Sequence, residues 1–284
     1  MASYRLLYRG TLIACMFLLG LLAVWAVMPA MRRFLGLRAE PLCVAIIRAW
    51  NRGVCRILKL RLSVTGRPDP PAGLTVANHI SWLDIIALGA IKPLVFVAKE
   101  EVAHWPVMGA LARGIGTLFI RRGDPEQAAV TLEAMTWQLR RGVNLMLFPE
   151  GTTTRGDQVL RFHGKLLLPA QLAGANVQAV ALRYRGPAAE VAPFIGDDAF
   201  LPHLLRVLTL PFVELELHFC PALPVGLRRD QLARTTRRQI EEKLHVGAER
   251  NGKDRMGVRS VPPPSPPVRS LNSVNRTSGV MKLS

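Results

Sequence analysis

A histidine and an aspartate, His79 and Asp84, lie five positions apart, directly after the apolar run 74–77. A histidine held by a carboxylate is a ready general base, because the carboxylate engages one ring nitrogen and leaves the other to accept a proton. On one ideal helix the two residues would be about 140° apart and could not readily meet. Ser81 is a good N-cap, however, and Ser81-x-x-Asp84 has the pattern of a capping box. We therefore expect a helix that begins at Ser81, with His79 on the turn before it and folded back toward Asp84.

A second polar segment follows another apolar run, 145–148. It contains Glu150, Gly151 and Thr152, and the glycine permits a tight turn. The threonine and the nearby backbone can donate hydrogen bonds, while the glutamate can orient a neighbouring cation or hydroxyl. We predict that these three residues contribute to substrate binding.

Three basic residues lie near the ends of candidate strands. Arg121 and Arg122 follow the run 117–120, and Lys99 follows the run 94–98. An arginine offers a two-pronged donor to phosphate, which a lysine does not. Such residues suit an anionic ligand, with Arg122 the foremost candidate; the alternative is a solvated strand end.

Taken together, these segments resemble the conserved blocks of the glycerolipid acyltransferase family, whose members acylate lysophosphatidic acid and related lysolipids. Residues 78–84 resemble its first block, 116–122 its second and 148–152 its third. Residues 177–182 lie where the fourth belongs, with Ala179 in place of the usual proline. The resemblance covers roughly 74–184 and implies an α/β fold with a mostly parallel sheet covered by helices.

The resemblance also implies acyl transfer from an acyl thioester to a lysolipid hydroxyl. His79 would take the hydroxyl proton, and backbone N–H groups near Ser81 could hold the developing oxyanion. No cysteine or serine stands in a nucleophile motif, which favours direct transfer without an acyl-enzyme. The co-substrate would be acyl-CoA or acyl carrier protein, and no cofactor is expected. No metal is expected either, because no second His or Cys stands at ligand spacing near His79.

The expected acceptor is 1-acylglycerol-3-phosphate, which would give phosphatidic acid. The family commonly has Arg after the Thr of the third block, whereas this chain has Thr153. A threonine there resembles a subset related to lyso-ornithine-lipid acyltransferases. Acylation of such a different lysolipid is therefore one alternative. A non-catalytic membrane-binding protein of the same fold is the other, and the presence of both His79 and Asp84 argues against it.

Composition limits the classes of partner. The 284 residues are 50% hydrophobic and carry a formal net charge of +17, which suits an anionic partner such as membrane lipid or an acidic carrier protein. Nucleic acid is not expected, because the basic residues are not interleaved with aromatic ones and no nucleic-acid motif occurs. The four cysteines lack zinc-ligand or redox-pair spacing and read as small buried hydrophobic residues.

The N-terminal region has the composition of a membrane segment. The run 11–31 contains no charged residue and would span about 30 Å as a helix, enough to cross a bilayer core. Basic residues flank it on both sides, so the sequence permits either a spanning helix or one that enters and returns. We expect an uncleaved anchor in the cytoplasmic (inner) membrane, with the active site on the cytoplasmic side.

The segment 42–60 carries basic residues every three or four positions. This spacing places them on one helical face, which suits either an anionic membrane surface or a helix packed on the core with a solvated basic face. We predict three regions: 1–60, the anchor and basic helix; 61–246, the acyltransferase domain; and 247–284, a disordered basic Pro-rich tail.

Within the middle region, short apolar runs alternate with helical patterns, as in a parallel sheet covered by helices. The candidate strands are 74–77, 94–98, 117–120, 144–148, 177–184 and 213–219. The candidate helices are 81–90, 125–140, 165–173, 199–207 and 228–245.

Overall fold

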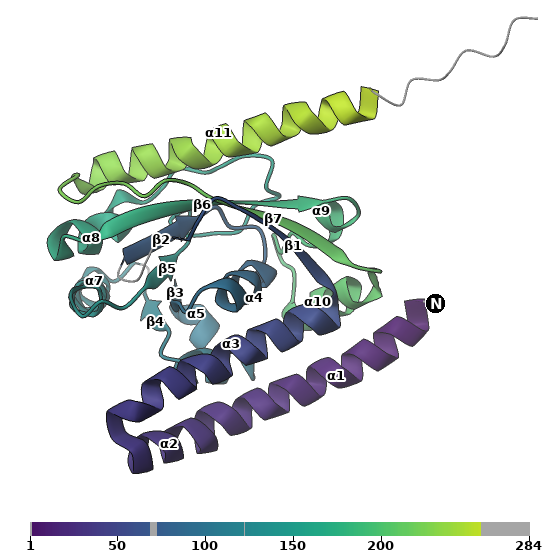
Figure 1. Ribbon diagram of the computed structural model, residues 1–284, viewed down its shortest axis with the longest axis horizontal. Helices are drawn as coiled ribbons and strands as arrows, with labels where there is room; N and C mark the ends of the chain where they lie inside the picture. The colour runs from purple at the N-terminus through teal and green to yellow at the C-terminus, as the bar shows by residue number, and fades with distance from the viewer. Residues whose placement is uncertain (1, 69–72, 122, 257–284) are drawn as a thin grey trace, which may run out of the picture. The chain divides into compact units, whose positions relative to one another are not determined.

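A computed structural model describes residues 2–68, 73–121 and 123–256 (Figure 1). The described residues form one seven-stranded sheet with the order β1-β7-β6-β2-β5-β3-β4. All neighbouring strands are parallel except β6 and β7, which are antiparallel. The strands are β1 (Leu60–Thr65), β2 (Gly73–Ala77), β3 (Val95–Lys99), β4 (Leu118–Ile120), β5 (Leu145–Leu147), β6 (Asn176–Arg185) and β7 (Val213–Phe219). This confirms the mostly parallel α/β sheet expected from the sequence.

The six expected strands all form, and β7 has the bounds that its alternating pattern predicts. The central strands β2 and β5 are almost wholly buried, as continuous apolar runs in a parallel sheet should be. Strand β1 was not predicted. It is an edge strand whose last residues are exposed, so it has neither the buried run nor the clean alternation that marks the others.

Helices cover both faces of the sheet (Figure 1). They are α4 (Trp82–Ile91), α5 (Glu100–Ala103), α6 (Met108–Gly114), α7 (Pro125–Arg140), α8 (Leu168–Ala173), α9 (Ala188–Val191), α10 (Phe200–Thr209) and α11 (Arg229–Met256). Strand β6 shows how the faces divide: Leu182 and Tyr184 join the core with α4 and α10, whereas Ala179 and Ala181 join the core with α7 and α11.

The last helix departs from its expected bounds. The sequence predicts its end at His245, but α11 continues to Met256, and the chain forms one compact unit only up to Gly247. The rest of the expected tail, 257–284, lies outside the described residues.

The N-terminal region is a helical hairpin (Figure 1). Its first arm runs through α1 (Ala2–Leu22), a π-helical turn (Ala23–Val27) and α2 (Met28–Leu35). Gly36, with φ of +56°, starts a short turn, and α3 (Ala39–Leu58) returns along the first arm. Length and composition make this helical stretch long and apolar enough to cross a membrane.

Arginines of the hairpin are bound to the ends of domain helices. Arg9 donates to the carbonyl oxygens of Leu210 and Pro211 after α10, at 2.6 and 2.9 Å. Arg48 and Arg52, on α3, donate to the carbonyls of Ile91 and Ala90 at the end of α4, both at 3.1 Å. A cation is favourable at a helix C-terminus, where carbonyl groups lack intrahelical partners. Helix α3 therefore packs on the domain, as one of the two interpretations expects, but Arg48 and Arg52 bind the end of α4 and do not form a purely solvated face.

Candidate active site

The candidate site lies where the parallel strands end. Carboxyl ends of parallel strands meet at one edge of a sheet, and ligands of open α/β sheets bind outside that edge. His79 follows β2, and Glu150 follows the neighbouring strand β5. Lys99 ends β3, and Arg121 follows β4. The topology thus brings the described members of the predicted set to one edge of the sheet.

The His79–Asp84 pair has the geometry that the capping pattern predicts. Ser81 is the N-cap of α4, and Asp84 lies in its first turn. Nδ1 of His79 lies 2.9 Å from Oδ2 of Asp84, and this oxygen also accepts from the backbone N–H groups of Ile80 and Ser81, at 2.8 and 2.9 Å. Asp84 is fully buried, so its carboxylate is fixed by the loop that it caps.

These contacts define the protonation pattern of the histidine. An ionised Asp84 can only accept, so Nδ1 of His79 carries a hydrogen and Nε2 is the acceptor. The imidazole stacks on the Phe148 ring with centroids 3.8 Å apart and planes inclined by 11°. Its side chain is 18% exposed. The arrangement can take a proton from a hydroxyl that approaches Nε2.

The same contacts change the expected oxyanion site. The sequence suggests that backbone N–H groups near Ser81 hold the oxyanion. In the structure the N–H groups of Ile80 and Ser81 already donate to Asp84. These two groups therefore position the carboxylate and are not free to bind a reaction intermediate.

Glu150 fixes the backbone of the histidine loop. Its Oε1 accepts from the N–H of His79 and its Oε2 from the N–H of Leu160, both at 3.1 Å. The His79 carbonyl in turn accepts from the Thr154 N–H at 2.9 Å. Burial raises the pKa of Glu150 to about 7, an effect that the two N–H groups and Arg237 partly offset and the charge of Asp84 reinforces. The histidine is thus held through both of its backbone groups.

Helix α11 supports this loop from outside. Arg237 donates to the carbonyls of Val159 and Leu160, at 2.9 and 3.1 Å, and pairs with Glu241 at 2.7 Å. Leu160 is the residue whose N–H binds Glu150. A chain of hydrogen bonds therefore runs from α11 to the histidine loop.

Strand β6 holds the other side of the site. Beyond the end of β2, the Asn78 side chain takes the place of backbone pairing: its amide donates to the Leu182 carbonyl at 3.0 Å and accepts from the Leu182 N–H at 2.8 Å. Two residues further along β6, the Tyr184 hydroxyl donates to Oδ1 of Asp84 at 2.7 Å. Both Asp84 oxygens are thereby engaged.

The remaining predicted residues lie in the turn after β5 and at the end of β4. Gly151 has a φ of +71° and its N–H donates to the Phe148 carbonyl at 3.0 Å, which confirms the tight turn. Thr152, beside it, is exposed. Arg121 pairs with Glu100 through two nitrogens and lies 3.8 Å from Asp124. It follows the edge strand β4, three strands and about 14 Å from β2. Arg122 lies outside the described residues.

Five supporting residues were not predicted as part of the site: Asn78, Phe148, Thr154, Tyr184 and Arg237. Phe148 belongs to the third sequence block, so its place beside Glu150 could have pointed to a contact. The partners of Tyr184 and Arg237 are 100 and at least 77 positions away, which no local pattern reveals. Among the described residues, no three His, Cys, Asp or Glu side chains form a set that could hold a metal ion.

Comparisons with known proteins show which proteins this chain is similar to. A sequence model of the Acyltransferase family matches residues 61–183. A lyso-ornithine lipid O-acyltransferase of Pseudomonas aeruginosa is 41% identical over 244 residues, which are 84% of this chain and 93% of the relative. A 1-acyl-sn-glycerol-3-phosphate acyltransferase of Neisseria meningitidis is 36% identical over 69% of this chain and 78% of the relative. The crystal structure of the acyltransferase PlsC from Thermotoga maritima shares the fold, with a TM-score of 0.61 at 20% identity, and covers 85% of this chain and 97% of that one.

Proposed function

This chain belongs to the acyltransferase family and is an O-acyltransferase of lysolipids, and we propose that its acceptor is a lyso-ornithine lipid and that His79 is the general base. The observation that carries the mechanism is the 2.9 Å contact between His79 and the buried Asp84. The acyl donor in this proposal is the thioester of coenzyme A or of acyl carrier protein.

In the proposed reaction, Nε2 of His79 removes the proton from the lysolipid hydroxyl. The hydroxyl oxygen attacks the thioester carbonyl, the carbon–sulfur bond breaks, and the departing thiolate takes the proton from His79. Asp84 stabilises the imidazolium that forms in between. Both Glu150 oxygens already bind backbone N–H groups, so we assign Glu150 to positioning His79 rather than to contacting the substrate.

Two observations support a lyso-ornithine lipid as the acceptor. The lyso-ornithine lipid O-acyltransferase of Pseudomonas aeruginosa is more similar to this chain, and matches more of it, than the 1-acyl-sn-glycerol-3-phosphate acyltransferase of Neisseria meningitidis. The position after Thr152 carries the neutral Thr153, and Arg121 is engaged by two carboxylates. A head group with no net charge suits such surroundings better than a phosphate monoester does. 1-Acylglycerol-3-phosphate, the acceptor expected from the sequence, becomes the second candidate, because the Neisseria relative is also similar over most of its length.

We propose that the hairpin places the enzyme on the membrane, in the cytoplasmic membrane with the site on the cytoplasmic side. Large apolar side chains of the hairpin are exposed, among them Leu18, Leu19, Leu22, Trp25 and Phe34. Exposed apolar surface on this scale is typical of a membrane contact. A lysolipid acceptor would then reach the site from the bilayer.

A two-by-two assay tests the acceptor and the donor. The purified protein is given lyso-ornithine lipid or 1-acylglycerol-3-phosphate, each with acyl-CoA or acyl carrier protein thioester, and products are identified by mass spectrometry. We expect a higher kcat/KM with lyso-ornithine lipid. A preference for 1-acylglycerol-3-phosphate with both donors would overturn the acceptor assignment, and equal product from the His79→Ala variant would overturn the mechanism.

A further inference from the structure

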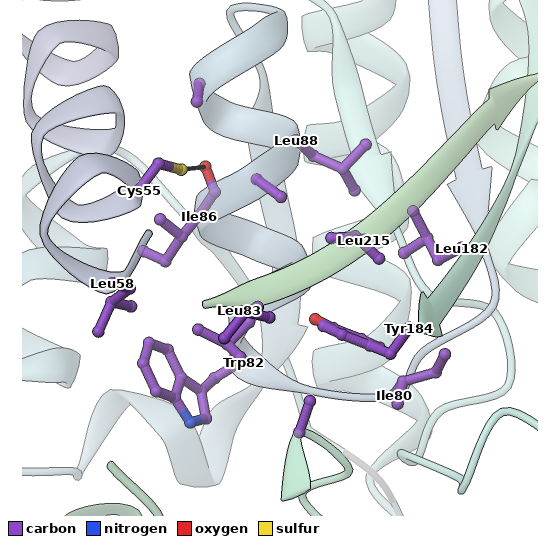
Figure 2. Close-up of a cluster of buried hydrophobic side chains, with 14 of the residues drawn as sticks. Cys55, Leu58, Ile80, Trp82, Leu83, Ile86, Leu88, Leu182, Tyr184 and Leu215 are labelled. Carbon is purple, nitrogen blue, oxygen red and sulfur yellow. Dashed lines mark hydrogen bonds between the residues drawn. The ribbon is translucent and has the colours of Figure 1, made fainter. Parts of the chain in front are cut away.

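Tyr184 has no role in the function described so far, yet its hydroxyl touches the catalytic pair. The residue lies near the end of β6, on the face that packs against α4. In Figure 2 its hydroxyl end is directed toward Leu83 at the start of α4. The residue is 5% exposed, and the hydroxyl donates to Oδ1 of Asp84 at 2.7 Å.

The hydroxyl is held in the donor state by its surroundings. Burial, and then the neighbouring charge of Asp84, raise the pKa of Tyr184 well above its ordinary value. The group therefore keeps its hydrogen, which it shares with the carboxylate. A hydrogen bond to a charged acceptor inside a protein is stronger than one between neutral groups.

We propose that Tyr184 is a positioning residue for acyl transfer, which sets both the orientation and the basicity of Asp84 and, through Asp84, the basicity of His79. This inference rests on the proposed general-base role of His79. The inference follows from the different partners of the two Asp84 oxygens. Oδ2 binds His79 and the backbone of its loop, and Oδ1 accepts a hydrogen bond from Tyr184.

The hydrogen bond has a predictable electrostatic effect. By donating to Oδ1, Tyr184 withdraws charge from the carboxylate and weakens its attraction for the Nδ1 hydrogen of His79. Without the hydroxyl, Asp84 would stabilise the imidazolium more strongly, and His79 would hold its proton to higher pH. The base would then be available only at higher pH, and the carboxylate would lose the donor that holds Oδ1 in place.

Other ionisable groups near the pair have to be separated from this effect. Glu150 faces the histidine loop from the segment after β5 and has a pKa of about 7, so it titrates in the range of the assay. Cys55 on α3 makes a small contribution to the raised pKa of Tyr184, but burial raises the pKa of Cys55 itself to about 11. Arg237 on α11 acts on Glu150.

The experiment is the pH dependence of kcat/KM for Tyr184→Phe, which removes only the hydroxyl. We expect kcat to fall about tenfold with KM nearly unchanged. We also expect the acidic limb of the kcat/KM profile to move to higher pH by about 0.5 pH unit. The shift should persist in a Glu150→Gln background, which removes the other group that titrates there. Thr136→Val is the matched control, because its buried hydroxyl binds the Leu132 carbonyl on α7, away from the site.

The outcomes distinguish this inference from the proposed function. A Tyr184→Phe profile that coincides with that of the wild type, or a shift equally large in Thr136→Val, would overturn it. Full activity of His79→Ala would instead overturn the proposed function. If Tyr184→Phe folds poorly, the His79 pKa measured by NMR on the folded fraction decides, and a value at or below that of the wild type counts against the inference.

Discussion

Nδ1 of His79 and Oδ2 of Asp84 lie 2.9 Å apart although the two residues are five positions apart in the sequence, because His79 precedes helix α4 and Asp84 caps its first turn. The carboxylate has two tasks: it closes the first turn of α4 and it orients the imidazole. Substitutions at His79 and at Asp84 should therefore differ in their effects on activity and stability.

His79→Ala should abolish acyl transfer and leave folding intact, because the ring is partly exposed and packs mainly on Phe148. Asp84→Asn should reduce both activity and stability, since an uncharged amide oxygen accepts more weakly from the two backbone N–H groups and His79, and the amide NH2 group cannot accept from the Tyr184 hydroxyl. A buried donor left unpaired costs about 1–3 kcal/mol. Thermal unfolding and turnover, measured on both variants, check this contrast. Equal stability loss in the two variants would contradict it.

Glu150 should make stability depend on pH. Its pKa is raised from 4.5 to about 7 in the folded protein, chiefly by burial. The folded state therefore binds this proton more tightly than the unfolded chain, and stability from this group falls as pH rises from about 4.5 to 7 and is constant above that. The loss is at most on the order of 3 kcal/mol. Denaturant unfolding at several pH values should show this slope in the wild type.

The matched variant for this measurement is Glu150→Gln, which cannot titrate. It should lack the slope between pH 4.5 and 7, and at neutral pH it should be less active because one of the two backbone hydrogen bonds is lost. Parallel pH profiles of stability for the two proteins would show that Glu150 does not titrate in this range.

Thr153→Arg should lower turnover with both acceptors. The Thr153 hydroxyl donates to the Phe194 carbonyl, and the Phe194 N–H donates to the Ile80 carbonyl. An arginine at this position breaks that link beside the histidine loop. Gln158→Arg is the matched control, because Gln158 is exposed in the same segment and its replacement adds the same charge. Steady-state kinetics with both lysolipids compare them, and improved turnover of 1-acylglycerol-3-phosphate by Thr153→Arg would favour the second acceptor.

Replacing Arg48 and Arg52 together with alanine should destabilise the fold by about 1–2 kcal/mol, because both donate to the last carbonyls of α4. Arg56→Ala, in the same helix but exposed, should leave unfolding unchanged and weaken binding to anionic vesicles in a salt-dependent way. Chemical denaturation and vesicle sedimentation separate the two effects. Equal stability of the double variant and the wild type would argue against a role for this contact.

Leu18→Glu combined with Leu22→Glu should sharply reduce membrane binding without loss of stability in detergent, because both side chains are more than half exposed on the hairpin. Deleting the whole first arm is a poorer test, since it also removes Arg9 from the end of α10. Flotation with vesicles measures the binding. Unchanged flotation of the double variant would show that this face does not enter the bilayer.

Local sequence patterns predicted the secondary structure and the His79–Asp84 pair, but they did not predict the tertiary contacts around the site. The capping box at Ser81 was enough to place His79 against Asp84, and the alternation in 213–219 was enough to define β7. By contrast, the partners of Tyr184 and Arg48 lie 100 and 43 residues away, so their roles depend on how the chain folds back on itself. The same basic spacing in α3 fits a lipid surface and a helix end equally well.

Helix α4 carries Asp84 in its first turn and is held at its last turn by the arginines of α3. Helix α3 also packs along α4 nearer its start, where Cys55 contacts the Ile86 carbonyl, so α4 couples the hairpin to the His79 loop along its length. With the hairpin seated in the bilayer as proposed, this coupling would fix the position of His79 relative to the lipid surface. We expect that an acceptor would then be selected by how far its hydroxyl extends from the membrane as well as by its head group.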